Sequence, residues 1–187
     1  MEKNDYNKRA DLARKARQQQ IVAIAESLIE QDLIENFDPV HSPLCAIDVV
    51  IIAGAPWLKE ALEKDYIKDE SGYKKIGGGA NNPSKNYFYR SSANLIHFFK
   101  RQGLYIPRGG KIQPAIGMVC FFEWDDRGRF NFSPDRSGII AKVNDNNQII
   151  SVIVATTSSN NNFVVQKIDI SQNPSMQKAI IGYSDLP

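Results

Sequence analysis

The sequence has little cysteine and little histidine. Each type occurs twice in 187 residues, as Cys45, Cys120, His41 and His97. The cysteines lack a CxxC spacing, and so few soft ligands exclude a typical structural zinc site. Nothing in the sequence supports a disulfide between the two cysteines. We therefore expect no metal site, and no organic cofactor is indicated.

Long apolar runs are also absent. No run approaches the roughly 18 residues of a membrane-spanning helix, and the polar start of the chain lacks the apolar core of a signal peptide. Charge of one sign is scarce as well, because 23 basic and 21 acidic side chains leave a net charge of +2. This balance argues against a nucleic-acid partner. We expect no transmembrane segment and leave the oligomeric state open.

The chain has enough apolar residues to form one well-buried domain, since 42% of its 187 residues are hydrophobic. Residues 8–36 carry apolar side chains at three- and four-residue steps, which predicts a long amphipathic helix packed on that domain. These positions are Leu12, Ala13, Ala16, Ile21, Ile24, Ala25, Leu28 and Leu33. We expect residues 1–36 to form a helical extension and residues 37–187 to form the domain.

A basic cluster from Lys8 to Arg17 lies in this helix. Such a cluster would suit a helix that binds a membrane surface or a partner. Residues 1–36 as a whole, however, hold six basic and seven acidic side chains, which gives 6 minus 7, or −1. This balance favours a solvated outer face.

Cys45 lies where a helix should begin. Ser42 suits the helix cap, Pro43 suits the first helical position, and the apolar run from Leu44 to Ala53 ends at Gly54. Unpaired N–H groups and the helix dipole favour anions at this place, so a thiolate would have a pKa below the ordinary value of about 8.5. A small buried cysteine is also common in apolar helices, so both roles stay open.

The rest of the chain predicts helices followed by strands. Helices are expected at Trp57 to Tyr66 and Ser91 to Gln102, with a long loop at Lys68 to Lys85 between them. Segments rich in Val, Ile and Phe then predict an antiparallel sheet of at least four strands. They are Met118 to Trp124, Ser137 to Val143, Ile149 to Ala155 and Phe163 to Ile170. This order predicts an α+β fold in which the Cys45 helix packs on the sheet and Cys120 lies in the core.

Five short segments carry a resemblance to a known family. They are Leu44 to Val50, Tyr89 to Gly103, Gly117 to Val119, Ser137 to Ile140 and Ile180 to Tyr183. In order and spacing the chain resembles the NlpC-type and CHAP-type cysteine peptidases and amidases of bacterial cell walls, most closely the uncharacterised YijF-like family, over roughly residues 15 to 186. The resemblance implies a papain-like fold.

The resemblance also implies a mechanism, in which the Cys45 thiolate attacks an amide carbonyl of a peptidoglycan peptide and an imidazole from the sheet acts as the base. That histidine should immediately precede Gly138, but this chain has Ser137 there. An uncharged hydroxyl cannot replace a group that titrates near neutrality. His41, close to Cys45 in sequence, is a weaker candidate base. The third polar residue would fall around Thr156 or Thr157.

Three further residues are candidates for substrate binding. Asp48 lies one helical turn after Cys45, and Arg90 is placed to hold a substrate carboxylate bidentately. Tyr89 stands where relatives commonly have a histidine. A surface carboxylate and a structural salt bridge are the alternatives for Asp48 and Arg90. For His97 we expect a helix-surface or satisfied core imidazole.

Two functions therefore remain open. The first is a cysteine hydrolase for cell-wall amide bonds, impaired because Ser137 replaces the histidine and because Met118 replaces the usual aspartate. The second is an inactive papain-fold pseudoenzyme that binds a peptide, a glycan or a partner protein through the sheet edge and the Lys68 to Lys85 loop. The resemblance implies a periplasmic or secreted protein if the chain starts at a truncation.

Overall fold

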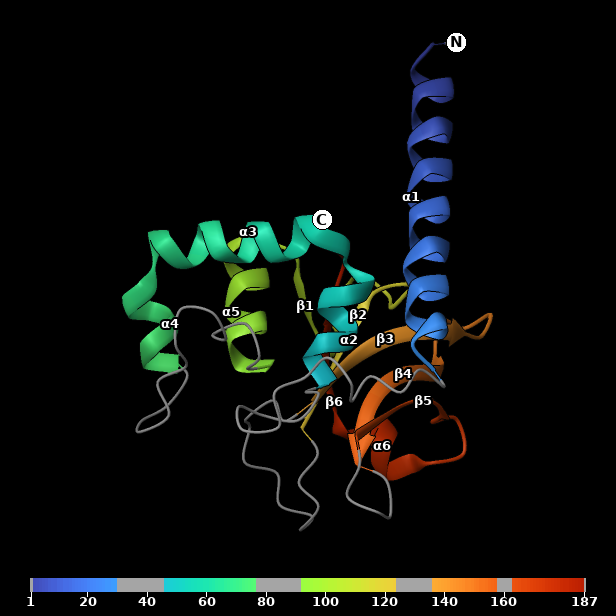
Figure 1. Cartoon of the computed structure of the whole chain (residues 1–187). Helices are drawn as coiled ribbons and strands as arrows, with labels where there is room; N and C mark the ends of the chain where they lie inside the picture. Colours follow the sequence, from blue (N-terminus) through green and yellow to red (C-terminus); the bar gives the residue numbers. More distant parts are fainter. Residues whose placement is uncertain (1, 30–45, 77–91, 124–135, 158–162, 187) are drawn as a thin grey trace.

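The computed structural model describes residues 2–29, 46–76, 92–123, 136–157 and 163–186 (Figure 1). The elements before residue 102 are helices, and the later ones are strands with one short helix among them. The helices are α1 (Glu2–Ser27), α2 (Ala46–Ala53), α3 (Ala55–Lys68), α4 (Glu70–Ile76), α5 (Ser92–Arg101) and α6 (Pro174–Ala179). The strands are β1 (Tyr105–Pro107), β2 (Val119–Phe122), β3 (Arg136–Val143), β4 (Ile149–Thr157), β5 (Phe163–Asp169) and β6 (Ile180–Ser184). The predicted α+β class is confirmed.

The strands form one six-stranded sheet in the order β1-β6-β2-β3-β4-β5, with every neighbouring pair antiparallel. The four predicted strands correspond to β2, β3, β4 and β5. β1 and β6 extend the sheet beyond this prediction. β6 is the last strand in the sequence, yet it pairs with both β1 and β2.

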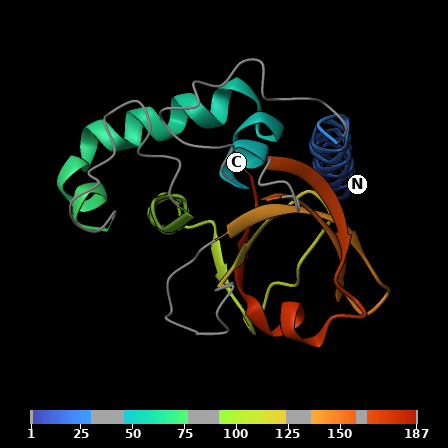
Figure 2. The ribbon, with the colours of Figure 1, turned by 60° about the horizontal axis from the view of Figure 1, so that its bottom comes forward.

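The two faces of the sheet bury different layers, and Figure 2 shows the curved sheet between α2 and α6. Val119 and Phe121 of β2 belong to the core shared with α1, α2, α3 and α5. Cys120 and Phe122 alternate with them and belong to the core shared with α6. Cys120 is fully buried, as predicted, and burial raises the pKa of its thiol.

Only the second half of α1 packs on the domain. Ile21, Val22, Ala25 and Leu28 are buried in the helix-side core. The first half extends beyond the other elements (Figure 1), and Leu12 in it is 67% exposed. Within the described residues, the predicted apolar face of α1 therefore packs at Ile21 and beyond but not at Leu12. The prediction of a helix as far as residue 36 is wrong, because α1 ends at Ser27 and a turn follows at residues 28–29. The predicted domain boundary at residue 36 lies outside the described residues.

The predicted loop from Lys68 to Lys85 is wrong in its first part, where α4 forms. Tyr73 anchors this helix, since its side chain is completely buried. A salt bridge of 2.6 Å between Lys74 and Glu70 spans one turn. The loop was predicted from Gly77 to Gly79 and from Asn81, Asn82 and Pro83 later in the segment, whereas burial of Tyr73 stabilises a helix before them. Residues 77–85 lie outside the described part.

The bounds of α3 and α5 and the end of α2 follow the predicted signals to within two residues, whereas α6 was not predicted. Gly54 ends α2, with its N–H donating to the Val50 carbonyl at 2.8 Å. Gly103 follows α5 with a φ of 70°, the left-handed conformation that ends many helices. None of the described helices is both long enough and apolar enough to cross a membrane.

Candidate functional site

Most of the predicted site residues fall outside the part of the chain that the structure describes. These are Cys45, His41, Tyr89 and Arg90. Asp48 lies in α2, but its side chain is also outside the description. Ser137 is therefore the predicted catalytic position whose surroundings the structure describes.

α2 begins at Ala46, directly after Cys45, and packs on the sheet. Its side chains Val49 and Val50 are fully buried, and they share a core with Ile139 of β3 and Ile153 of β4. α2 contacts both of these strands. The helix that follows Cys45 in the sequence thus packs against β3 and β4 on one face of the sheet, as predicted.

Ser137 lies on the face of β3 that points toward the helices. It shares this face with Ile139, and it pairs with Phe121 across the ladder to β2. Its side chain is fully buried, and its hydroxyl has no hydrogen-bond partner among the described residues. A hydroxyl enclosed among apolar side chains provides no group that titrates near neutrality. Ser137 therefore supplies no base.

The third polar position of the resemblance lies at the end of β4. Thr156 pairs with Val164 and Thr157 pairs with Phe163 of β5. Ala155 and Ile153, earlier in β4, belong to the helix-side core. The side chains of Thr156 and Thr157 lie outside the description.

A second group of polar side chains joins α3, α4 and α5, and we call it the polar cluster. It consists of Asp65, Asp69, Tyr73, His97 and Arg101.

Asp65 is the centre of the polar cluster. Its carboxylate accepts hydrogen bonds from the Tyr73 hydroxyl at 2.7 Å and from Nε of Arg101 at 2.8 Å. The neighbouring carboxylate of Asp69 lies 2.8 Å from Nε2 of His97 and 3.2 Å from Nη1 of Arg101. The His97 ring also contacts the Tyr73 ring edge to face, with centroids 4.8 Å apart.

These contacts change the acid–base properties of the group. Burial, followed by the hydrogen bond to Asp65, raises the pKa of Tyr73 well above its usual value. The hydrogen bond from His97 holds the pKa of Asp69 below its usual range, and the Arg101 charge acts in the same direction. The hydrogen bond to Asp65 raises the pKa of Arg101.

The polar cluster is a set of mutually paired groups. His97 is 21% exposed and already paired with a carboxylate, which agrees with the prediction of a satisfied imidazole. The sequence contained a signal for this cluster, because Asp65 and Asp69 are one helical turn apart, as are His97 and Arg101. That signal could not show that the two pairs face each other.

The fold and the site define an α+β domain in which a short apolar helix, α2, packs on an antiparallel sheet. No protein-family model matches the chain, and no curated protein matches it significantly. Across the described ranges, no three His, Cys, Asp or Glu side chains gather in a way that could hold a metal ion.

Proposed function

We propose that the chain is a papain-like domain related to the NlpC-type cysteine hydrolases in which the catalytic base has been lost, and that it acts as a binding module for a peptide, a glycan or a partner protein. The burial of Ser137 carries this proposal. At the position where the resemblance places the histidine, the chain has an enclosed, uncharged hydroxyl. Without a base, neither thiol activation nor protonation of the leaving amine is possible at that position.

A second candidate is a cysteine hydrolase for peptidoglycan peptides, with Cys45 as the nucleophile and His41 as the base. The packing of α2 favours it, because α2 starts directly after Cys45 and lies against β3 and β4. Papain-like chemistry requires a thiol at the start of a helix that packs on a sheet, and the resemblance assigns that position to Cys45. Asp48, Tyr89 and Arg90 are its proposed substrate contacts, and the resemblance implies a location outside the cytoplasm.

The pH dependence of alkylation distinguishes the two functions. The folded protein is treated with iodoacetamide between pH 5 and 10, and modification of each cysteine is followed by mass spectrometry. For the binding module we expect a Cys45 pKa of about 8.5 or higher, the value of an unactivated thiol. Cys120 is the internal control, since it is buried and its pKa is raised. Rapid Cys45 alkylation below pH 7 would favour the hydrolase instead.

A second measurement uses purified peptidoglycan sacculi as the probe. For the binding module, the wild-type chain sediments with the sacculi, releases no peptides, and retains its binding when Cys45→Ser is introduced. The hydrolase predicts release of new amino groups that Cys45→Ser abolishes. Release of this kind would overturn the proposed loss of the base.

A further inference from the structure

A basic surface lies where the segment after β1 meets α6. Residues 103–122 and 170–184 together hold three basic side chains and no acidic one. The three are Arg108, Lys111 and Lys178, and all of them are exposed. Across the described ranges, none of the three forms a salt bridge. We call these three residues, together with Ile112, the basic patch.

Hydrogen bonds to the backbone hold the basic patch in place. Nη1 of Arg108 donates to the carbonyl oxygen of Lys178 at 2.7 Å, which joins the end of β1 to α6. The backbone N–H of Arg108 donates to the carbonyl of Ile181 at 3.1 Å, and the N–H of Gly110 closes a turn onto the carbonyl of Pro107 at 2.9 Å. Because a carbonyl carries no net charge, Arg108 remains an uncompensated cation. The turn that carries the patch is thus fixed to both α6 and β6.

Ile112 adds an exposed apolar side chain to these charges. It follows Lys111 directly and is 58% exposed. The chain returns to the core just afterwards, since Pro114 is buried and Ala115 packs against the core on the α6 side. Single exposed aliphatic side chains are common, but this one stands next to cations that lack a carboxylate partner. An apolar side chain among cations is typical of a segment that lies at a membrane interface.

The small net charge of the whole chain does not oppose binding to an anionic surface. Salt screens charges that lie further away than about 8–10 Å. An anionic surface therefore interacts mainly with the side chains closest to it, and not with the total charge of +2. In the basic patch these side chains include three cations and no carboxylate.

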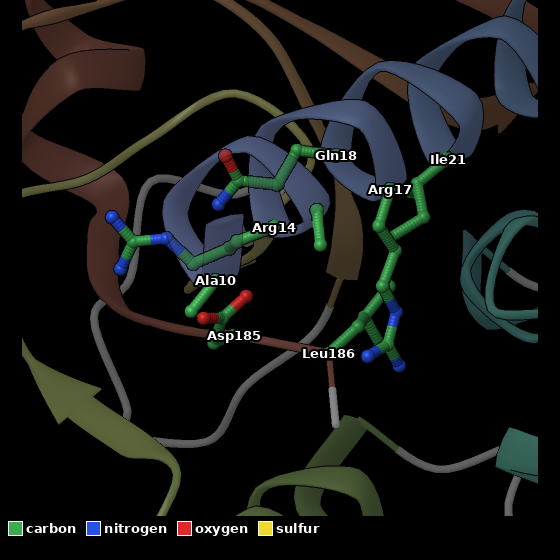
Figure 3. A pocket seen from close by; sticks show the side chains of 8 residues that line it. Ala10, Arg14, Arg17, Gln18, Ile21, Asp185 and Leu186 are labelled. Carbon is green, nitrogen blue, oxygen red and sulfur yellow. The ribbon is translucent and has the colours of Figure 1, made fainter. Parts of the chain in front are cut away.

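α1 carries a second basic surface, but acidic side chains accompany it. Asp11 lies 3.3 Å from Arg14. Figure 3 shows that Asp185 lies in the groove that Arg14 and Arg17 also line. Carboxylates among the cations reduce the attraction of an anionic surface. α1 therefore provides the matched control for the basic patch.

We propose that the basic patch binds the surface of an anionic lipid bilayer. Lys111 and Lys178 contact the headgroup phosphates, and Ile112 enters the apolar boundary below them. Arg108 adds a third positive charge and ties the end of β1 to α6. The patch lies on the α6 side of the sheet, whereas Ser137 lies on the side of the other helices. It therefore does not depend on the function proposed above.

The test measures cosedimentation of the full chain with vesicles of phosphatidylcholine, with and without phosphatidylglycerol. We expect binding only to the vesicles that contain phosphatidylglycerol, with an affinity that falls as the salt concentration rises. Each cation near an anionic surface strengthens binding about fivefold, so Lys111→Glu with Lys178→Glu should weaken it at least tenfold. Lys8→Glu with Lys15→Glu changes the charge equally on exposed positions of α1 and should weaken binding less than threefold.

Ile112→Asn tests insertion without a change of charge. We expect this variant to weaken vesicle binding at least threefold, because less apolar surface enters the bilayer. Since Ile112 is exposed, the substitution should leave the fold intact even if a charge variant does not fold. Circular dichroism checks the fold of each variant.

Three results would overturn the proposal. The first is a wild-type chain that does not sediment with the phosphatidylglycerol vesicles at low salt. The second is an equal loss in the two charge variants, which would mean that the vesicles attract the positive charge of the chain in general. The third is an unchanged affinity of Ile112→Asn together with equally tight binding of soluble polyphosphate, which would identify the ligand as a soluble polyanion.

Discussion

Tyr73 of α4 contacts residues of both α3 and α5. Its ring lies 5.6 Å from the Tyr66 ring and 4.8 Å from the His97 ring. A buried tyrosine hydroxyl needs an acceptor, and Asp65 provides it at 2.7 Å. Arg101 balances the charge of that carboxylate. One residue thus links the apolar core to the polar cluster.

Removing the Tyr73 hydroxyl should destabilise the domain. We expect Tyr73→Phe to lower the free energy of unfolding by about 1–2 kcal/mol, because a buried hydrogen bond to a charged acceptor is lost. Urea denaturation measures the change. Tyr66→Phe is the matched control, since its hydroxyl makes a longer bond of 3.4 Å to Glu70, and it should cost less. Equal costs for the two variants would contradict the central role given to Tyr73.

At the scale of elements, the packing of α1 on the domain depends on a close approach between the backbones of Gly117 and Gln18. Gly117 has a φ of 80°, and a Cβ there would lie 2.7 Å from the carbonyl oxygen of Gln18. Only glycine fits both conditions. Further along α1, Lys167 of β5 pairs with Glu26 at 2.6 Å. α1 is thus held at a backbone contact and at an ion pair.

Gly117→Ala should therefore release α1 as well as strain the backbone. The left-handed conformation alone costs about 1–2 kcal/mol, and the clash with Gln18 adds roughly 1–3 kcal/mol. Gly103→Ala is the control, because its φ is 70° but nothing lies within 4 Å of the added Cβ. We expect faster tryptic cleavage within α1 for Gly117→Ala alone. Similar cleavage rates for both variants would contradict the role given to the Gly117–Gln18 contact in holding α1.

Sequence patterns predicted elements well where the signal was local. The apolar run before Gly54 predicted α2, and Gly103 marked the end of α5. The same reasoning missed α4, because the burial of Tyr73 involves contacts with Asp65 of α3 and His97 of α5 that local patterns do not show. It also missed β1, which has three residues and depends on β6 for all of its pairing. For the candidate site, it placed Ser137 on a strand but could not show its burial.

At the scale of the whole molecule, burial raises the pKa values of one cysteine and several tyrosines. It is the largest cause of the raised pKa values of Cys120 and of Tyr66, Tyr73, Tyr105 and Tyr183. In the unfolded chain, thiols titrate at about pH 8.5 and tyrosines at about pH 10. Above these values the unfolded state releases protons that the folded state retains. Stability must therefore fall as the pH rises.

We expect the free energy of unfolding to decline from about pH 8.5 upward, with a further decline above about pH 10. The proton retained on Cys120 contributes a slope of up to about 1.4 kcal/mol per pH unit. Denaturant unfolding at a series of pH values measures this profile. Cys120→Ala should remove the earlier part of the decline and leave the tyrosine part. A profile that stays flat to pH 11 would show that these groups are not buried as described.

The sequence by itself determined the α+β class, the end of α2, the bounds of α3 and α5 to within two residues, and four of the six strands, because periodicity and glycine ends act between residues close in the chain. Only the tertiary structure decided that β6 lies between β1 and β2, that Ser137 is enclosed, that two helical pairs meet around Asp65, and that half of α1 stays uncovered. Each of these depends on contacts between segments distant in the chain, where packing and desolvation outweigh local preference.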